Sequence, residues 1–326
     1  MNPLLLRYLT EMQNKGCLKF YKDRSLSLVS TFGIGGKASV FVLPETEEAL
    51  IDTVCMASAL GRYKVIGNAS NLLFDDRGFS GAVISTVRLR SLALSDAPTD
   101  PHGRRLIEKC GGRFIRCGCG VMLPSLSAFA ARSAVTGFEG LCSIPATVGG
   151  AICQNAGAYG SEISDTLVAC EVFYPDTHEK RLIYSEECGF SYRHSLIGRK
   201  GETVLSAYFK AEPGEEREIN ERIARNKAYR LASQPTGVRS AGSYFCRPSN
   251  ETSAGELIDR CGLKGMRVGG AEVSTVHANF IVNKTGIASA DDVLRLASAV
   301  KRNVKKRFGV ELTEEVEFVP RRSGNR

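Results

Sequence analysis

The chain lacks tryptophan, and it lacks any run of about 18 apolar residues, the length that a membrane-spanning helix needs. Its N-terminus carries only a three-leucine run before Arg7, which is too short for the core of a signal peptide. We therefore expect no membrane insertion and a cytoplasmic location. The net charge of +8 is spread along 326 residues without an aromatic stripe for stacking bases, which argues against binding of nucleic acid.

Several familiar motifs are also missing. No G-x-x-x-x-G-K-[ST] sequence occurs, which excludes a P-loop, and no G-x-S-x-G elbow occurs, which argues against a hydrolase. The segment GIGGKA at 33–38 matches a dinucleotide fingerprint, but a strand-like run follows it where that fingerprint requires a helix. We therefore reject a Rossmann domain.

The eleven cysteines are odd in number and show no C-x-x-C spacing, so we expect reduced, mostly buried thiols rather than a disulfide framework. Zinc ligation by Cys110, Cys117 and Cys119 with His102 is the alternative. The alternating sequence RFIRCGCGV instead puts Cys117 and Cys119 on one face of a strand, and their spacing fits no standard zinc pattern. No metal site is therefore predicted.

Apolar spacing predicts helices and strands in mixed order, which favours the α+β class over a doubly wound sheet. The predicted strands span 38–44, 62–67, 81–89, 112–121, 168–174, 180–185, 202–210, 277–283 and 310–319, and the predicted helices span 9–16, 44–61, 123–137, 215–233, 253–262 and 289–309. The polar segment 95–105 is typical of a surface loop or an insertion. Alternation in the last strand puts Glu315 and Glu317 on one face.

Two long glycine-rich segments, IGNASNLL at 66–73 and IPATVGGAICQNAGAYG at 144–160, stand out between these elements. Small residues let the backbone approach a pyrophosphate closely, and successive N–H groups then bind its oxygens. Each segment alone is typical of a tight turn. Two of them, with Ser and Asn embedded, favour a ligand the size of a flavin or a nucleotide.

Isolated polar residues are less informative. Ser240 and Ser243 in SAGSYF have the chemistry of a nucleophile, a proton donor or a cap, and the local sequence favours a cap. Arg193 in SYRHS is typical of a solvated surface turn when it is taken alone. A carboxylate that points inward near the C-terminus would need a purpose, because burying an unpaired charge is costly.

The order of the motifs along the chain is more informative about the family than any single motif. The chain resembles the UDP-N-acetylenolpyruvoylglucosamine reductase (MurB) family over about 31–318, through the segments TFGIGG, IGNASNLLFDDRGFSG, GFEGLCSIPATVGGAICQNAGAYGSEI, YRHS, QPTGVRSAGSYFCRP, AGELIDRCGLKGMRVGGAEVS, HANFIVN and LTEEVEF. Eight motifs in the right order are highly specific. The short stretch between Asp165 and Cys188 is similar to the shorter, second type of the family.

The resemblance implies an α+β fold in which a two-subdomain FAD-binding part of the vanillyl-alcohol-oxidase (PCMH) type precedes a C-terminal α+β substrate-binding domain. The expected boundaries are a lead-in at 1–29, an FAD-binding domain at 30–212 with subdomains at about 30–90 and 91–212, and a substrate-binding domain at 213–326. The charged helix 215–233 marks the junction. A monomer is expected.

The resemblance also implies non-covalent FAD, with NADPH as co-substrate. Carried over position by position, the cofactor-binding residues are Gly67, Asn68, Ala69, Ser70, Asn71, Ser143, Pro145, Ala146, Thr147, Gly149, Gly150, Asn155 and Gly157. Ala69 and Ala146 replace glycines of the family pattern. Alanine fits at negative φ, whereas positive φ would bring strain or a shifted turn.

The implied reaction is the reduction of UDP-N-acetylglucosamine enolpyruvate to UDP-N-acetylmuramate, a step of peptidoglycan precursor synthesis. Hydride passes from reduced FAD to C3 of the enol ether, and a proton passes to C2. Arg193 matches the family arginine that stabilises the developing negative charge, Glu315 matches the glutamate beside it, and Ser243 matches the proton donor.

Three further positions match substrate contacts of the family. Tyr192 is expected at the substrate, and Arg230 and Gln234 at the UDP diphosphate, which suits the fork geometry of arginine. The alternatives are an FAD oxidoreductase with another substrate and a non-catalytic relative that binds a UDP-sugar. The complete set of Arg193, Ser243 and Glu315 argues against both.

Overall fold

The computed structural model describes residues 2–95, 108, 112–249 and 251–322. The segment expected to be a loop or insertion lies outside these residues from 96 to 105, as do His102 and Cys110. Within the described part of the chain, no helix is long and apolar enough to cross a membrane. The same residues contain no group of three or more His, Cys, Asp or Glu side chains arranged to hold a metal ion.

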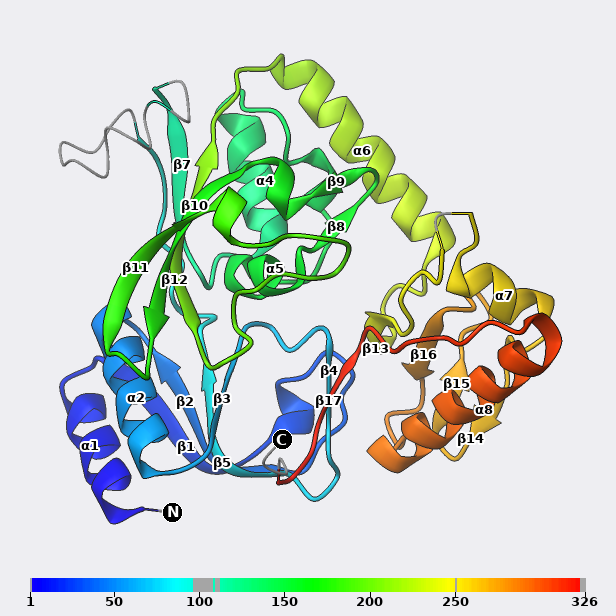
Figure 1. Ribbon diagram of the computed structural model, residues 1–326, viewed down its shortest axis with the longest axis horizontal. Coiled ribbons are helices and arrows are strands. Elements are labelled where there is room, and N and C mark those ends of the chain that lie inside the picture. The colour runs from blue at the N-terminus through cyan, green and yellow to red at the C-terminus, as the bar shows by residue number, and fades with distance from the viewer. Residues whose placement is uncertain (1, 96–107, 109–111, 250, 323–326) are drawn as a thin grey trace. The chain divides into compact units, whose positions relative to one another are not determined.

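The chain forms two compact units, each built from several segments. Unit 1 comprises Met1–Phe20, Phe41–Asn68 and Val83–Arg230, and unit 2 comprises Tyr21–Val40, Ala69–Ala82 and Leu231–Arg326. Each unit contains both helices and strands, so the predicted α+β class is confirmed. The two units are described separately below (Figure 1).

The elements within unit 1 are α1 (Pro3–Asn14), α2 (Glu47–Leu60), β3 (Tyr63–Ile66), β6 (Leu92–Ser95), β7 (Phe114–Gly118), α4 (Leu123–Arg132), α5 (Val148–Gln154), β8 (Gly157–Ala158), β9 (Ser161–Glu162), β10 (Leu167–Tyr174), β11 (Glu179–Tyr184) and β12 (Thr203–Lys210). Three strands run from one unit into the other along the chain: β1 (Leu18–Ser25), β2 (Lys37–Pro44) and β5 (Phe79–Ser85). Helix α6 (Glu216–Ser233) does the same. Strands β1, β2 and β5 belong to a sheet with the order β1-β2-β5-β3.

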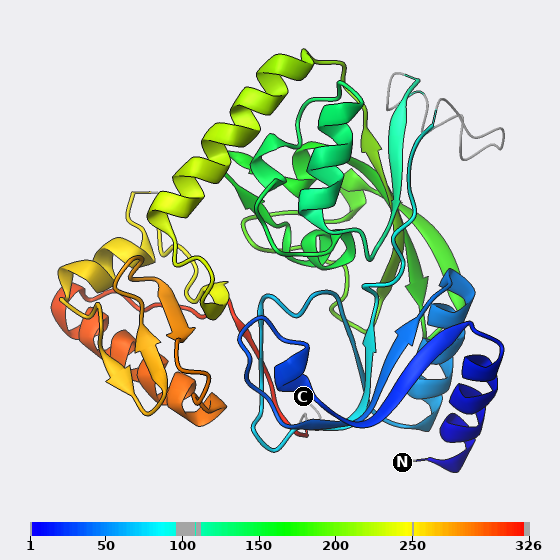
Figure 2. The ribbon, with the colours of Figure 1, turned by 180° about the vertical axis from the view of Figure 1, so that it is seen from behind.

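A second sheet in unit 1 has the order β11-β10-β12-β7-β6 with antiparallel neighbours. Helices α4 and α5 lie on one side of it (Figures 1 and 2). Gly149 allows α5 to approach β7, because a Cβ there would lie 3.0 Å from the Cβ of Cys119. Helix α5 is a finding of the structure, since the sequence predicted only turns over 144–160. Its N-cap Thr147 accepts a hydrogen bond from Gly150 N, and Asn155 ends it in the left-handed conformation.

Unit 2 holds β4 (Leu72–Phe74), β13 (Arg239–Ser243), α7 (Ala254–Arg260), β14 (Arg267–Val268), β15 (Ala271–Val273), β16 (Phe280–Asn283), α8 (Ala290–Phe308) and β17 (Glu317–Val319). Its main sheet has the order β13-β16-β15-β14, and β17 pairs in parallel with β4. The apolar face of α8 packs on this sheet through Leu296 and Val300 (Figure 1). Helix α8 begins at the predicted cap Ser289 and ends at Gly309, as the sequence indicated.

Two predictions in unit 2 were wrong. The strand expected over 310–319 is regular only at Glu317–Val319, with an isolated bridge between Glu314 and Phe245, so the face shared by Glu315 and Glu317 does not exist as described. Ser243 lies in β13 and caps no helix. In both cases, backbone pairing with distant strands decided the local conformation.

Asp75 joins the C-terminal strand to the rest of unit 2, and it carries a pH prediction. Its N–H donates to Val319 O, and its buried carboxylate accepts hydrogen bonds from the Arg77 side chain and from Arg321 N. The Arg77 side chain lowers the pKa of Asp75 from 3.8 to about 2. A depressed folded-state pKa stabilises the fold above the unfolded value, and this contribution disappears as the pH falls from about 4 to about 2.

We therefore expect Asp75→Asn to lower the stability of the fold by about 1–2 kcal/mol at neutral pH. The difference between the two proteins should shrink toward zero near pH 2. Urea unfolding of wild type and variant across pH 2–7 measures it. A difference that stays constant over this range would contradict the assignment to the Asp75 charge.

Candidate active site

The two glycine-rich segments contact each other in unit 1. The side-chain amide of Asn68 donates to Pro145 O at 2.9 Å. A Cβ at Gly67 would lie 2.1 Å from Thr147 Oγ1, so glycine is needed for the Gly67 backbone to lie this close to the Thr147 side chain. Residues that are some 77 positions apart in the chain therefore form one small surface.

The two alanines that replace family glycines differ. Ala69 has a φ of +49°, whereas Ala146 is not among the residues with positive φ. The strain expected for a non-glycine residue is thus present at Ala69, at a cost of about 1–2 kcal/mol, and absent at Ala146. Ala69 is buried, so this left-handed turn is held within the packed structure.

Some N–H groups of the second segment already have partners in unit 1. Val148 N donates to Val121 O, Gly149 N to Cys119 O and Gly150 N to Thr147 Oγ1. Gly149 and Gly150 therefore contribute small size rather than free N–H groups. The backbone N–H groups of Val148, Gly149 and Gly150 are therefore not the donors to a phosphate in this segment.

The close approach at Gly67 predicts a large effect on stability. In Gly67→Ala, the new Cβ collides with Thr147, whose own Cβ would lie 3.2 Å away, so the cap of α5 must be displaced. We expect a loss of about 2 kcal/mol, because a broken N-cap alone costs about 1 kcal/mol. Thermal unfolding of the purified protein measures it.

Two matched variants test the cause. Gly150→Ala meets its nearest neighbour at 3.4 Å and should leave the melting temperature nearly unchanged. The substitution Gly67→Ala should cost less stability in the Thr147→Ala background than in wild type, because the 2.1 Å collision with Oγ1 is gone and only the 3.2 Å contact with Cβ remains. A Gly67→Ala protein that melts like wild type would show that the two segments are not held together as described.

Arg193 is held rather than solvated, so the interpretation as a simple surface turn was wrong. It has a φ of +51° in the turn between Ser191 and His194, and its side chain is 21% exposed. Nη2 donates to Gly157 O at 2.7 Å, and Nη1 donates to Asn155 O at 3.3 Å. The guanidinium also lies over the ring of Tyr192, 5.0 Å from its centroid. The side chain is therefore fixed before any ligand binds.

Ser243 and Glu315 lie close together in unit 2. Ser243 ends β13, and the next residue, Tyr244, accepts the backbone N–H of Glu315 at 2.8 Å. Asn279 supports the same segment, since its side-chain amide exchanges two hydrogen bonds with the backbone of Phe245. The hydroxyl and the carboxylate are thus carried by adjacent, paired backbone segments.

The neighbouring glutamates are distinguished by their contacts. Both oxygens of Glu314 bind Lys301 Nζ, at 2.9 and 3.0 Å, in an exposed ion pair. Glu315 is half-buried, and its backbone carbonyl accepts from the side-chain amide of Asn71 at 3.0 Å. Asn71 belongs to the first glycine-rich segment, so this segment touches the Glu315 backbone within unit 2.

The predicted substrate contacts occupy different environments. Tyr192 is 47% exposed. Arg230 lies beside Tyr159. Burial raises the pKa of Tyr159 above its usual value of 10, and the Arg230 cation offsets part of that rise. Among the described residues, Gln234 Oε1 is buried without a hydrogen-bond partner, as a ligand-binding amide would be.

Sequence reasoning missed Tyr159 and Glu162. Tyr159 has a φ of +56°, and its ring packs edge-on against Tyr229 at 5.9 Å. Glu162 lies 3.6 Å from Arg193. The signal was present in the segment GAYGSEI, but no local pattern indicates which of its side chains turns toward Arg193.

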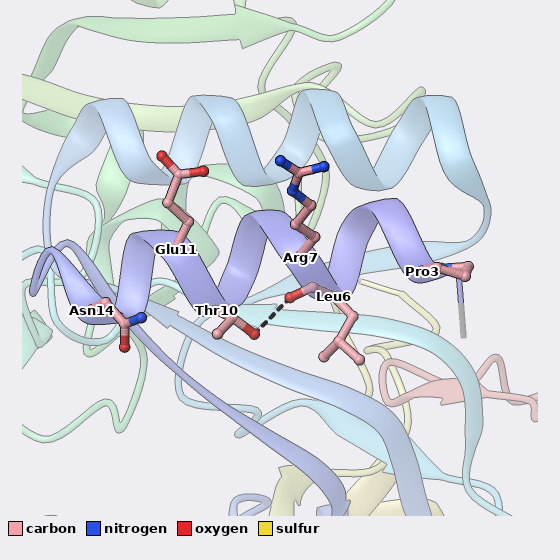
Figure 3. Close-up of a pocket in the computed structure, with 6 residues that line it drawn as sticks. All are labelled: Pro3, Leu6, Arg7, Thr10, Glu11 and Asn14. Carbon is pink, nitrogen blue, oxygen red and sulfur yellow. Dashed lines mark hydrogen bonds between the residues drawn. The ribbon is translucent and has the colours of Figure 1, made fainter.

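The structure therefore yields two clusters, one in each unit. Unit 1 brings together Gly67 and Asn68 with Pro145 and Thr147, and places Arg193 against Asn155 and Gly157. Unit 2 brings together Asn71, Ser243 and Glu315. A hollow of about 550 Å³ lies elsewhere, on the outer face of α1, and is lined only by residues of that helix (Figure 3). It contains none of the predicted site residues.

Comparison with known proteins identifies the class. Residues 38–182 match the model of an FAD-binding domain, and residues 234–319 match the model of the C-terminal domain of UDP-N-acetylenolpyruvoylglucosamine reductase. The chain is thus an FAD-dependent oxidoreductase, and the predicted cofactor and FAD-binding fold are confirmed.

Individual relatives define the family. UDP-N-acetylenolpyruvoylglucosamine reductase of Agathobacter rectalis is 38% identical over 98% of this chain and 99% of its own. That of Halalkalibacterium halodurans is 37% identical over 92% and 94%. The crystal structure of the Thermus caldophilus reductase (MurB) matches 93% of this chain and 99% of its own, with 36% identity and a TM-score of 0.73. The chain belongs to the UDP-N-acetylenolpyruvoylglucosamine reductase family.

Proposed function

We propose that this chain reduces UDP-N-acetylglucosamine enolpyruvate to UDP-N-acetylmuramate, with NADPH as the electron donor. The main support for this proposal is that the predicted catalytic side chains are already held by protein contacts in each unit. Arg193 is fixed by two carbonyls in unit 1, and Ser243 and Glu315 are held together in unit 2. Relatives named for this reaction align with nearly the whole chain.

The residues present fit FAD. The two glycine-rich segments lie against each other at Gly67, Asn68, Pro145 and Thr147, and Ala69 has the left-handed conformation. We propose that Gly67, Asn68, Ala69, Ser70 and Asn71 line one side of the cofactor. Ser143, Pro145, Ala146 and Thr147 line the other, with Gly149, Gly150 and Gly157 leaving room. When bound, FAD takes a hydride from NADPH and supplies it to C3 of the enol ether.

Arg193 stabilises the charge that develops on the substrate. Addition of hydride at C3 pushes electron density through C2 toward the substrate carboxylate. A cation that is already oriented lowers the energy of that state without reorganisation at the moment of reaction. Its contacts with Gly157 O and Asn155 O fix the plane of the guanidinium, whose fork geometry suits a carboxylate.

Ser243 donates the proton that C2 needs, and Glu315 assists the same reaction. A serine hydroxyl is a weak acid, but the carbanion-like C2 is a much stronger base than a serine alkoxide, so the transfer is favourable. Glu315 is assigned this role because its backbone N–H bonds to O of Tyr244, the residue next to Ser243.

Substrate binding is assigned to Tyr192, Arg230 and Gln234. Tyr192 supports the Arg193 guanidinium through its ring. The Arg230 guanidinium can bind a diphosphate through two parallel hydrogen bonds. The Gln234 Oε1, which has no hydrogen-bond partner among the described residues, can accept a hydrogen bond from the substrate. We further propose that the chain acts as a monomer in the cytoplasm, in the synthesis of peptidoglycan precursors.

An anaerobic stopped-flow experiment tests the function. NADPH should bleach the visible band of the bound flavin, and UDP-N-acetylglucosamine enolpyruvate should then restore it. Recovery with oxygen but not with the sugar would instead indicate a flavoenzyme with another substrate. Binding of the sugar without any recovery would indicate a relative that binds but does not catalyse.

A further inference from the structure

Asn155 has nearly all of its hydrogen-bonding groups committed inside unit 1. It is 1% exposed, and its φ of +41° ends α5. Its Nδ2 donates to Glu162 Oε2 at 2.8 Å and to Ser191 O at 3.1 Å, and its Oδ1 accepts from Ser164 N at 3.2 Å. Its backbone carbonyl accepts from Arg193. This residue was predicted to bind the cofactor, yet both its Nδ2 and its Oδ1 make hydrogen bonds within the protein.

Glu162 completes a closed ring of contacts. Its Oε2 accepts from Asn155 Nδ2, and its Oε1 lies 3.6 Å from Arg193 Nη1. Glu162 pairs with Gly157 in the β8–β9 hairpin, and Gly157 O is the second acceptor of the Arg193 guanidinium. The ring therefore runs from Arg193 to Asn155, on to Glu162, and back to Arg193.

We propose that Asn155 and Glu162 are positioning residues that fix the guanidinium of Arg193 for the substrate carboxylate. The inference rests on the proposed role of Arg193. Asn155 ties together the end of α5, the 3-10 turn Ile163–Asp165 that follows β9, and the turn that carries Arg193. Glu162 holds both the amide of Asn155 and the cation. Misplacing the cation by about 1 Å would slow the reaction on the order of 100-fold. Precise positioning by Asn155 and Glu162 therefore outweighs the cost of the strained turns at Asn155 and Arg193.

Glu162→Gln is a sharp probe of this ring. A carboxylate has two acceptor oxygens, and they face two donors, Asn155 Nδ2 and the Arg193 guanidinium. Glutamine has one acceptor oxygen and one NH₂ group, so one of the two contacts becomes donor against donor. The shape of the side chain is kept, while the attraction that orients Arg193 is lost.

The test is a double-mutant cycle on flavin reoxidation by the enolpyruvyl sugar. In the protein that keeps Arg193, Glu162→Gln should slow flavin reoxidation by about 10- to 100-fold. In the Arg193→Ala background, it should change the rate by less than about twofold, because the group that it positions is gone. Reduction by NADPH and flavin content should be unchanged. Glu179→Gln removes the carboxylate of an exposed ion pair in the same unit and is the matched control, without effect on either step.

Equal slowing in both backgrounds would overturn the proposal, since it would mean general structural support. Unchanged reoxidation in the Arg193 background would overturn it as well. A measurement that does not depend on the reaction distinguishes failure of the positioning proposal from failure of the proposed function. Hydrogen exchange of the Arg193 guanidinium, followed by NMR without substrate, should be faster in Glu162→Gln, and unchanged exchange contradicts the proposal even if the sugar is not the substrate.

Discussion

Ser243→Ala should leave the reduction of the flavin by NADPH nearly intact and slow its reoxidation by the enolpyruvyl sugar by about 100- to 10,000-fold. The proton at C2 is needed only after the hydride has left the flavin. The first half-reaction therefore has no use for the hydroxyl. Single-turnover stopped-flow traces, recorded for each half-reaction separately, measure both rates.

Ser240→Ala is the matched control for this variant. Ser240 lies on the same strand, three residues before Ser243, and its hydroxyl accepts one long hydrogen bond, from Gly242 N at 3.5 Å, within the part of the chain that the structure describes. Both half-reactions should be unaffected by its loss. Collapse of NADPH reduction in Ser243→Ala would show that Ser243 supports the fold or the cofactor, and the role of proton donor would fall.

Arg193→Ala should slow reoxidation by about 100- to 1,000-fold, the usual loss when one preorganised electrostatic contact is removed. NADPH reduction should again be unchanged, because negative charge develops on the substrate only in the second half-reaction. Arg193→Lys should recover little of the rate. A lysine ammonium is a single point of charge and cannot donate to Gly157 O, Asn155 O and a carboxylate in the same fork geometry.

Arg181→Ala is the control for loss of a cation from unit 1, since Arg181 forms an exposed ion pair with Glu179. It should leave both rates near those of wild type. If Arg193→Ala slowed both half-reactions equally, Arg193 would be holding the loop or the cofactor rather than the reacting substrate.

Local sequence patterns were reliable where one segment decides its own conformation. Helix α8 has its cap at Ser289 and its end at Gly309 because side-chain capping and a left-handed glycine are local effects. The alternating run around Cys117 likewise forms β7. Motif order predicted the α+β class, the FAD-binding domain and the family, all of which are confirmed.

Only the tertiary structure decided the features that depend on distant partners. The capping interpretation of Ser243 failed because β13 pairs with β16, and the long last strand failed because only Glu317–Val319 finds β4. Helix α5 forms in a glycine-rich segment because Gly149 packs against Cys119. The environment of Arg193 depends on carbonyls 36 and 38 residues away, and no window of sequence contains them. Residue types and their order thus established the family and the cofactor, whereas long-range hydrogen bonds and packing determined how the side chains proposed to react are held.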